Sequence, residues 1–290
     1  MFRHDPAIED ALFAPYRDSI AASAKACAEI TFNPSEDLNL WQSKLGGLPY
    51  LPLDGTYPHD PKGRPMRLLA QINFAEMPPL PDFPVQGILQ FFISRFSEMG
   101  NFWGADFDHP AKQGNFRVIY HRDVCTNPDA LIRDFPFLAA PARPQGFWRK
   151  LAYFIKNGED DMPFCTPCAM RFNPRLQYVP LEDPACRLKG SGVPVITHEN
   201  FFDKGFDEFS DYYSACFPAE GHRVGGYASQ VQDDIRFLHK PLADYVLLLQ
   251  IDSEPEKGIM WGDAGVAHFY IHPDDLRRCD FSRTAYSWEC

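Results

Sequence analysis

The sequence predicts an α+β fold of internally duplicated, mainly antiparallel β units, with an N-terminal helix and short peripheral helices. Apolar runs of strand length, rich in β-branched and aromatic residues, recur between glycines and prolines. The chain has 27 prolines in 290 residues, roughly twice the usual share of about 5%, and proline interrupts both helices and central strands. Two motifs also recur at one fixed separation along the chain. We therefore expect short elements, joined by ordered loops and built twice.

The elements follow in chain order. Apolar side chains at spacings of four predict a helix over 7–30, in which Pro15 predicts a kink. Aromatic residues at spacings of three and four predict a short helix over 202–217, and His272-Pro273 is typical of a helix start. Between residues 128 and 194 we expect surface loops and one strand near 176–179. The other strands are predicted at 68–74, 87–93, 116–120, 245–251 and 267–271.

The evidence for duplication is a common separation of 179 positions. It separates Gly46-Gly47 from Gly225-Gly226 (225 − 46), and the strand Leu68–Asn73 from the strand Leu247–Asp252 (247 − 68). The simpler alternative is chance, because leucine and glycine are common. We predict one domain over 1–290 with two related halves, about 38–127 and 218–290, joined by a proline-rich middle segment; two separate domains are the alternative.

A ligand site is expected where the matched strands end. Duplicated halves often pack face to face, which would bring Gln71 and Asn73 near Gln250 and Asp252 in a cleft between the halves. Amide and carboxylate groups at strand ends either satisfy loop backbone groups or reach into such a cleft. The cleft is the interpretation we follow.

Four further residues are candidates for the same site. His222 and Arg223 could pair with Asp263 or Asp252 in an acid–base or anion-binding cluster. Trp261 offers a stacking face. The structural alternative is a tight hairpin, with 258–261 as one strand, a turn at 262–265 and a second strand after it. A single histidine is also more often a core or surface residue than a catalyst.

Cys165-Thr-Pro-Cys168 has the spacing of zinc or thiol-exchange motifs. A structural zinc site usually takes four ligands, and no second such motif exists, so an ordinary loop is favoured. The sequence also lacks a Gly-x-Ser-x-Gly elbow, a His-Glu-x-x-His helix and a dinucleotide fingerprint. We therefore predict no cofactor and no metal.

The net charge of −11 disfavours binding to nucleic acids and to acidic membrane surfaces. No apolar stretch has the length of a membrane span, and the first residues do not have the pattern of a secretory signal. We therefore expect a cytoplasmic protein whose eight cysteines are reduced.

A set of motifs carries a family resemblance from about Leu38 to the C-terminus. It comprises residues 43–52, 68–74, 87–93, 222–226, 248–252 and 258–263. Together they resemble the YwqG-like family, a widespread, mainly bacterial domain of unknown function. The resemblance implies an α+β fold and a cytoplasmic protein, but no reaction, cofactor or catalytic residue. The segment around Cys165 and Cys168 does not match the family pattern.

Two classes of function stay open at this point. The first is a non-catalytic protein that binds a protein partner or a small-molecule ligand in the cleft between the halves. The second is a hydrolase-type enzyme that uses His222, Asp252 and Asp263 in that cleft. Whether the protein is an enzyme is not decided by its sequence.

Overall fold

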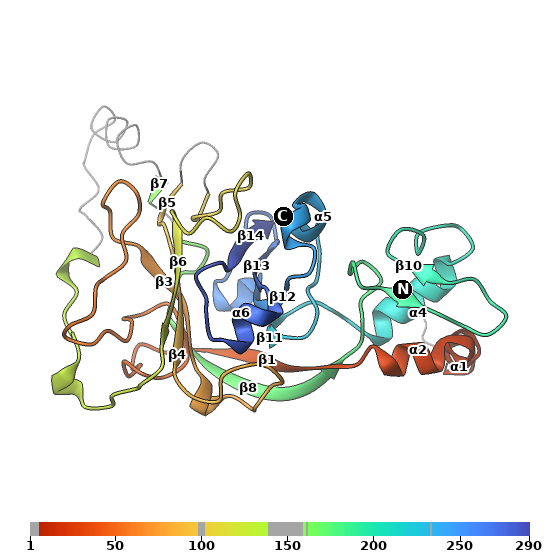
Figure 1. The fold of residues 1–290 in the computed structure, drawn as a ribbon, viewed down its shortest axis with the longest axis horizontal. Coiled ribbons are helices and arrows are strands. Elements are labelled where there is room, and N and C mark those ends of the chain that lie inside the picture. Colours follow the sequence, from red (N-terminus) through yellow and green to blue (C-terminus); the bar gives the residue numbers. More distant parts are fainter. Residues whose placement is uncertain (1–5, 98–101, 139–158, 161, 233) are drawn as a thin grey trace.

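The computed structural model describes residues 6–97, 102–138, 159–160, 162–232 and 234–290 (Figure 1). Its centre is a ten-stranded sheet in the order β14-β13-β12-β11-β1-β8-β2-β3-β4-β6, in which every described strand pair is antiparallel. The strands are β1 (Lys25–Pro34), β2 (Lys44–Leu45), β3 (Arg67–Asn73), β4 (Ile88–Ile93), β6 (Phe116–His121), β8 (Cys168–Gln177), β11 (His222–Gly225), β12 (Val246–Asp252), β13 (Val266–Ile271) and β14 (Ala285–Glu289).

Two small strand pairs and a few short helices complete the described fold. The pairs are β5 (Phe96–Ser97) with β7 (Glu159–Asp160), and β9 (Arg187–Leu188) with β10 (Ile196–Thr197). The helices are α1 (Pro6–Phe13), α2 (Arg17–Ala22), α4 (Asp207–Cys216), α5 (Ile235–Leu238) and α6 (Pro273–Arg277). The fold is thus mostly antiparallel β with an N-terminal helix, which confirms the main part of the predicted class.

The predicted N-terminal helix is correct only in its first part. A 3-10 turn at Ala14–Tyr16 separates α1 from α2, as the kink at Pro15 predicted. Residues 25–30 are not helical, however, but form the first part of β1. The side chains of Ala28, Ile30 and Phe32 alternate into the core, and this period of two determines the strand.

The prediction for the middle segment was wrong in one part, while residues 139–158 and 161 of this segment lie outside the described residues. The strand predicted near 176–179 overlaps only the end of β8, and the rest of β8, predicted as surface loop, pairs with β1 at the centre of the sheet. Proline lacks a ladder donor, so Pro174 made a central strand look improbable. The predicted hairpin is likewise wrong in its first strand, because Ile259 makes isolated bridges to Glu254 and Phe164 and lies outside the sheet.

The strand order reads the same way outward from the central β1/β8 pair. On one side β1 is followed by β11, β12, β13 and β14, and on the other side β8 is followed by β2, β3, β4 and β6. The registers agree as well, since Lys44 pairs with Gln71 and Arg223 with Gln250. A register shift also occurs in the third strand of each series, counted outward from β8 or β1. It lies between Leu68 and Ala70 in β3 and between positions 247 and 249 in β12.

The sheet curls until its two ends face each other, so that it is nearly closed. The Phe91 ring of β4 lies 4.6 Å from the Phe269 ring of β13, and Phe116 of β6 lies 5.3 Å from Tyr286 of β14. These side chains belong to the main core, which fills the inner face of the sheet. The two halves therefore meet through apolar side chains.

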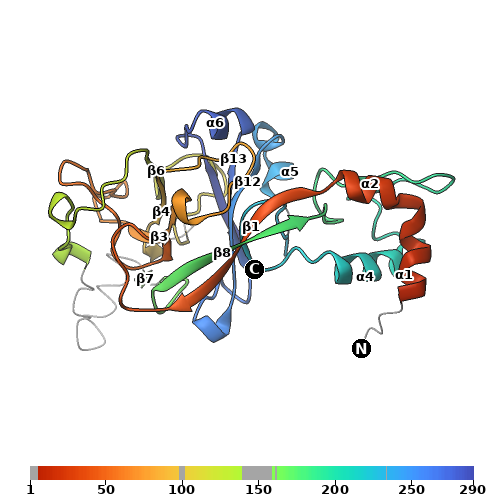
Figure 2. The same cartoon turned by 90° about the horizontal axis from the view of Figure 1, so that it is seen from below.

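A smaller lobe lies at the far end of the β1/β8 ribbon. Figures 1 and 2 show α1, α2 and α4 gathered there, away from the curled sheet. A second core packs inside this lobe, with Phe13, Tyr16, Phe209 and Tyr213 at its centre. The helix predicted over 202–217 is confirmed only over Asp207–Cys216, where Phe209 and Tyr213 are buried, whereas Phe202 lies outside the helix and is exposed.

No helix among the described residues is long and apolar enough to cross a membrane. All eight cysteines lie in the described part of the chain, and none of them forms a disulfide.

Candidate functional site

Gln71 lies on the outer face of β3, and its side chain is fully buried under a loop of its own half. Its Nε2 donates to the carbonyl oxygens of Leu40 and Gln42, both at 2.8 Å. Its Oε1 accepts from the Tyr50 N–H at 2.8 Å and from Gln90 Nε2 at 2.8 Å. These bonds fasten the segment before β2 and the segment after it to the sheet.

Gln250 makes the same bonds in the other half. Its Nε2 donates to the carbonyl oxygens of Ala219 and Gly221, at 3.1 and 2.7 Å, and its Oε1 accepts from the Ser229 N–H at 2.8 Å. Each of these three partners lies 179 positions after the corresponding partner of Gln71. Both glutamines therefore hold loops, and four strands lie between β3 and β12 in the sheet.

Asn73 and Asp252 also make hydrogen bonds within their own halves of the chain. The Asn73 N–H donates to Ser43 Oγ at 2.9 Å, and the Asp252 N–H donates to His222 Nδ1 at 3.0 Å. The two acceptors are again 179 positions apart. The structure does not bring Asn73 and Asp252 together.

The bond from Asp252 also limits the chemistry of His222. Because Nδ1 accepts a backbone N–H, the ring proton is on Nε2, which lies 3.3 Å from Glu254 Oε2. Burial is the main cause that lowers the pKa of His222, while Glu254 opposes it. With both nitrogens engaged, His222 is a poor general base for a bound substrate.

The remaining predicted site residues are dispersed. The Arg223 guanidinium is buried and donates to the carbonyl oxygens of Tyr227 and Glu220. Trp261 is fully buried in the core, so it offers no open stacking face, whereas Asp263 is exposed on a turn. The structure therefore places Asp252 beside His222 and Arg223, whereas Asp263 lies on a separate exposed turn.

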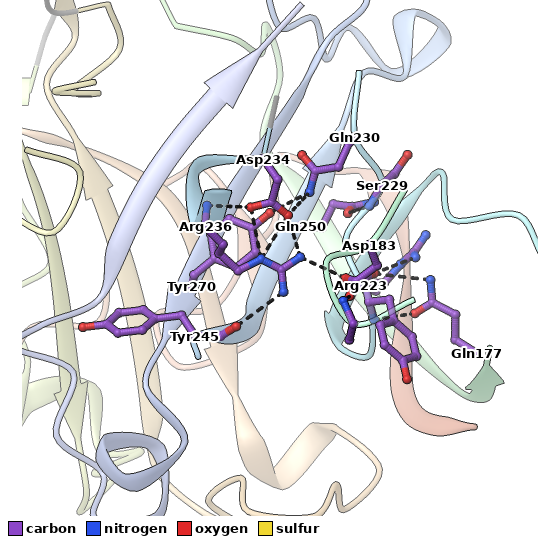
Figure 3. Close-up of polar contacts among 12 residues, drawn as sticks. Gln177, Asp183, Arg223, Ser229, Gln230, Asp234, Arg236, Tyr245, Gln250 and Tyr270 are labelled. Carbon is purple, nitrogen blue, oxygen red and sulfur yellow. Dashed lines mark hydrogen bonds and ion pairs between the residues drawn. The ribbon is translucent and has the colours of Figure 1, made fainter. Parts of the chain in front are cut away.

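Next to Arg223 lies a buried charged network that the sequence did not reveal (Figure 3). Arg236 of α5 donates to Asp183 at 2.9 Å and to Asp234, and its guanidinium carbon lies 4.9 Å from the Tyr270 ring centroid. Both aspartates are almost fully buried. Asp183 belongs to the segment after β8, so this network joins that segment to the curled sheet.

The two cysteines of Cys165-Thr-Pro-Cys168 differ in environment. Cys165 is exposed, while Cys168 is buried in β8, where desolvation raises the pKa of its thiol. Among the described residues, no group of three or more His, Cys, Asp or Glu side chains has a geometry suited to a metal ion.

A cavity of about 360 Å³ lies between the two halves, beside Gly225-Gly226. This volume is within the range of small-molecule sites, about 300–1,000 Å³. Its lining comes from the start of β1, from the loop at 81–83, from the start of β12 and from α6. The sequence-predicted residues do not line it.

Gly225 borders this cavity and has a left-handed backbone conformation that favours glycine. Its φ is +70°, and a Cβ there would lie 3.4 Å from the Phe83 ring. The Phe83 ring thus forms a wall of the cavity directly over the Gly-Gly turn. The Gly-Gly motif was the signal in the sequence, but the residues facing it were not identifiable.

The lining is mainly apolar, and one of its charges forms no ion pair with a carboxylate of the described residues. Among the described lining residues, Lys25 is the only cation, and its Nζ lies 4.0 Å from the Tyr227 ring centroid. Asp82 is the only anion there, and its Oδ2 lies 3.5 Å from Arg277 Nη1. The cavity therefore suits a ligand with an apolar body and a negative group at the Lys25 rim.

Comparison with known families identifies one match. A family model described as a domain of unknown function (DUF1963) matches residues 43–290, a range that includes both Gly-Gly pairs. No curated protein matches the chain.

Proposed function

The chain belongs to the DUF1963 family, whose function is unknown, and we propose that it is a non-catalytic binding protein for a small organic anion. The ligand occupies the cavity beside Gly225-Gly226, with its apolar body against Phe83 and Leu247 and its negative group at Lys25. The observation that carries this proposal is Lys25, the only cation among the described lining residues, at the rim of a mainly apolar cavity whose described anion, Asp82, is paired with Arg277. Such a combination of apolar lining and few polar groups is typical of ligand sites.

The test uses 8-anilinonaphthalene-1-sulfonate, whose fluorescence rises in apolar surroundings. The wild-type protein should bind one molecule in this cavity. Lys25→Met removes the charge and keeps most of the apolar stem, so it should weaken binding about fivefold, which is about 1 kcal/mol for a partly exposed ion pair. Lys25→Arg keeps the charge and serves as the matched control.

A second variant tests the cavity itself. Ala26 lines the cavity, and Ala26→Phe should fill it and abolish binding while the protein remains folded by circular dichroism. Equal affinity in wild type, Lys25→Met and Ala26→Phe would contradict the proposal, because the dye would then bind elsewhere.

We also infer that the two halves descend from one duplicated β unit. Support comes from the common separation of 179 positions in the Gly-Gly pairs, in the third strands and in the partners of Gln71 and Gln250. The equal strand order outward from β1 and β8 adds to it. On the motifs quoted above, we further propose that the chain is a YwqG-like member of its family.

We propose a cytoplasmic location, supported by eight cysteines without a disulfide. Cells lysed directly into maleimide and denaturant should yield protein with eight modified thiols. A smaller number would count against a reducing compartment.

A further inference from the structure

A second cavity, of about 610 Å³, lies beside the other Gly-Gly pair. Gly47, Arg67 and Leu68 line it, and these positions precede Gly226, Val246 and Leu247 of the first cavity by 179 residues. The two cavities thus occupy equivalent places in the two halves. We propose that this cavity is a second ligand site, selective for a neutral and largely apolar molecule.

An aromatic ring covers the glycine in both places. A Cβ on Gly46 would clash with Phe164 Cε2, whereas a Cβ on Gly225 would lie 3.3 Å from Leu80 Cδ1 and 3.4 Å from Phe83 Cε2. Phe164 also lines the second cavity, as Phe83 lines the first. Neither Phe164 nor Phe83 belongs to the repeated motif, so each site takes its aromatic wall from a different part of the chain.

Each lining has one cation and one anion among its described residues. In the first cavity Asp82 pairs with Arg277 outside the lining, which leaves Lys25, whereas in the second cavity the opposite charges of Glu36 and Arg67 leave the described lining without net charge. Most of the other lining side chains are apolar, including Leu48, Met162 and Phe164. An organic anion gains no net attraction here, whereas a neutral apolar molecule loses no hydration of a charged group on entry.

Cys165 gives the site a reporter of its own. Its side chain lines the cavity and is exposed, so a thiol reagent can reach it. A molecule in the cavity should shield this thiol. Cys290 is also exposed, lies outside the described lining, and serves as the internal reference.

The experiment uses N-phenyl-1-naphthylamine, which has the ring system of the anionic dye without its sulfonate. The neutral dye should bind the wild-type protein, and at saturation it should slow alkylation of Cys165 by iodoacetamide at least fivefold, measured by peptide mass spectrometry. The alkylation rate of Cys290 should not change.

Two exposed leucines give matched variants. Leu48 lines the cavity and Leu53 does not, although both are largely exposed. Leu48→Lys puts a charge in the apolar site and should weaken binding of the neutral dye at least tenfold, whereas Leu53→Lys should have no effect. Neither variant should change the effect of Lys25→Met on the anionic dye, so the two sites can fail separately.

Two results would overturn the second site. One is equal binding of the neutral dye by Leu48→Lys and Leu53→Lys. The other is bound neutral dye that leaves Cys165 alkylation as fast as in its absence.

Discussion

Replacing the two matched glutamines, one at a time, by methionine should destabilise the protein by a similar amount. Methionine has nearly the volume of glutamine but makes no amide hydrogen bonds. Gln250→Met removes three bonds to backbone groups, and Gln71→Met removes three such bonds and one to Gln90. At about 1 kcal/mol for each net hydrogen bond, each variant should lose about 3–4 kcal/mol.

The assay is urea unfolding at constant pH, with the free energy of unfolding taken from the midpoint and slope. Gln86→Met is the control, because Gln86 is exposed and should change stability by less than about 0.5 kcal/mol. The reasoning is refuted if Gln71→Met or Gln250→Met is as stable as the control. It is also refuted if Gln250→Met folds normally and loses ligand binding alone, since that would restore a ligand role for this side chain.

Three further predictions concern single residues. Arg236→Met leaves two buried aspartates without their ion-pair partner and should lower the free energy of unfolding in urea by about 3–5 kcal/mol. A decrease smaller than the one caused by substituting an exposed arginine would contradict this prediction. Gly46→Ala and Gly225→Ala should each cost at least about 1–2 kcal/mol, because φ is +63° and +70°, and Gly46→Ala should cost more because of the aromatic ring above it. Burial lowers the pKa of His268 from 6.5 to about 3. Between these pH values the unfolded chain binds a proton at His268 that the folded chain excludes, so the free energy of unfolding falls with falling pH, by up to about 1.4 kcal/mol per pH unit. His268→Gln should reduce the difference between the free energies of unfolding measured at pH 7 and pH 5.

Continuous apolar runs were sufficient to predict five of the ten strands in the sheet, namely β3, β4, β6, β12 and β13. The runs at 68–74, 87–93 and 245–251 are bounded by glycine or proline, and each lies within one or two residues of a strand in the structure. Their side chains are buried on both faces, which makes a continuous apolar run the expected pattern. Local composition therefore determined these elements.

The central strand β8 could not be predicted in the same way. Leu176 is 61% exposed, and four consecutive positions from 173 to 176 are largely or partly exposed, so this part of the strand has no apolar period. Its stability comes from ten paired positions with β1, a contact across more than 130 residues of sequence. Pairing at such a distance leaves no local signal.

The candidate site was missed for a related reason. A motif shows which residues recur, but Gln71 and Gln250 recur because a loop on each half needs the same three backbone partners. Residues that recur in both halves maintain the backbone structure that the halves share. Selectivity for a ligand depends instead on the residues that differ between the halves. Lys25 faces one Gly-Gly turn and the pair Glu36 and Arg67 faces the other.

The fold itself explains why the differing residues gather at these turns. β1 precedes the first repeated motif in the chain and pairs with β11, while β8 precedes the second and pairs with β2. Each Gly-Gly turn, which follows β2 or β11, therefore meets a segment from another part of the chain. A left-handed glycine leaves room above the turn, and the ring of Phe83 or Phe164 encloses that room from outside the repeat. Two cavities at equivalent places, lined by different residues, are the expected result. A ligand that binds Lys25→Met and Leu48→Lys equally well would be inconsistent with this arrangement.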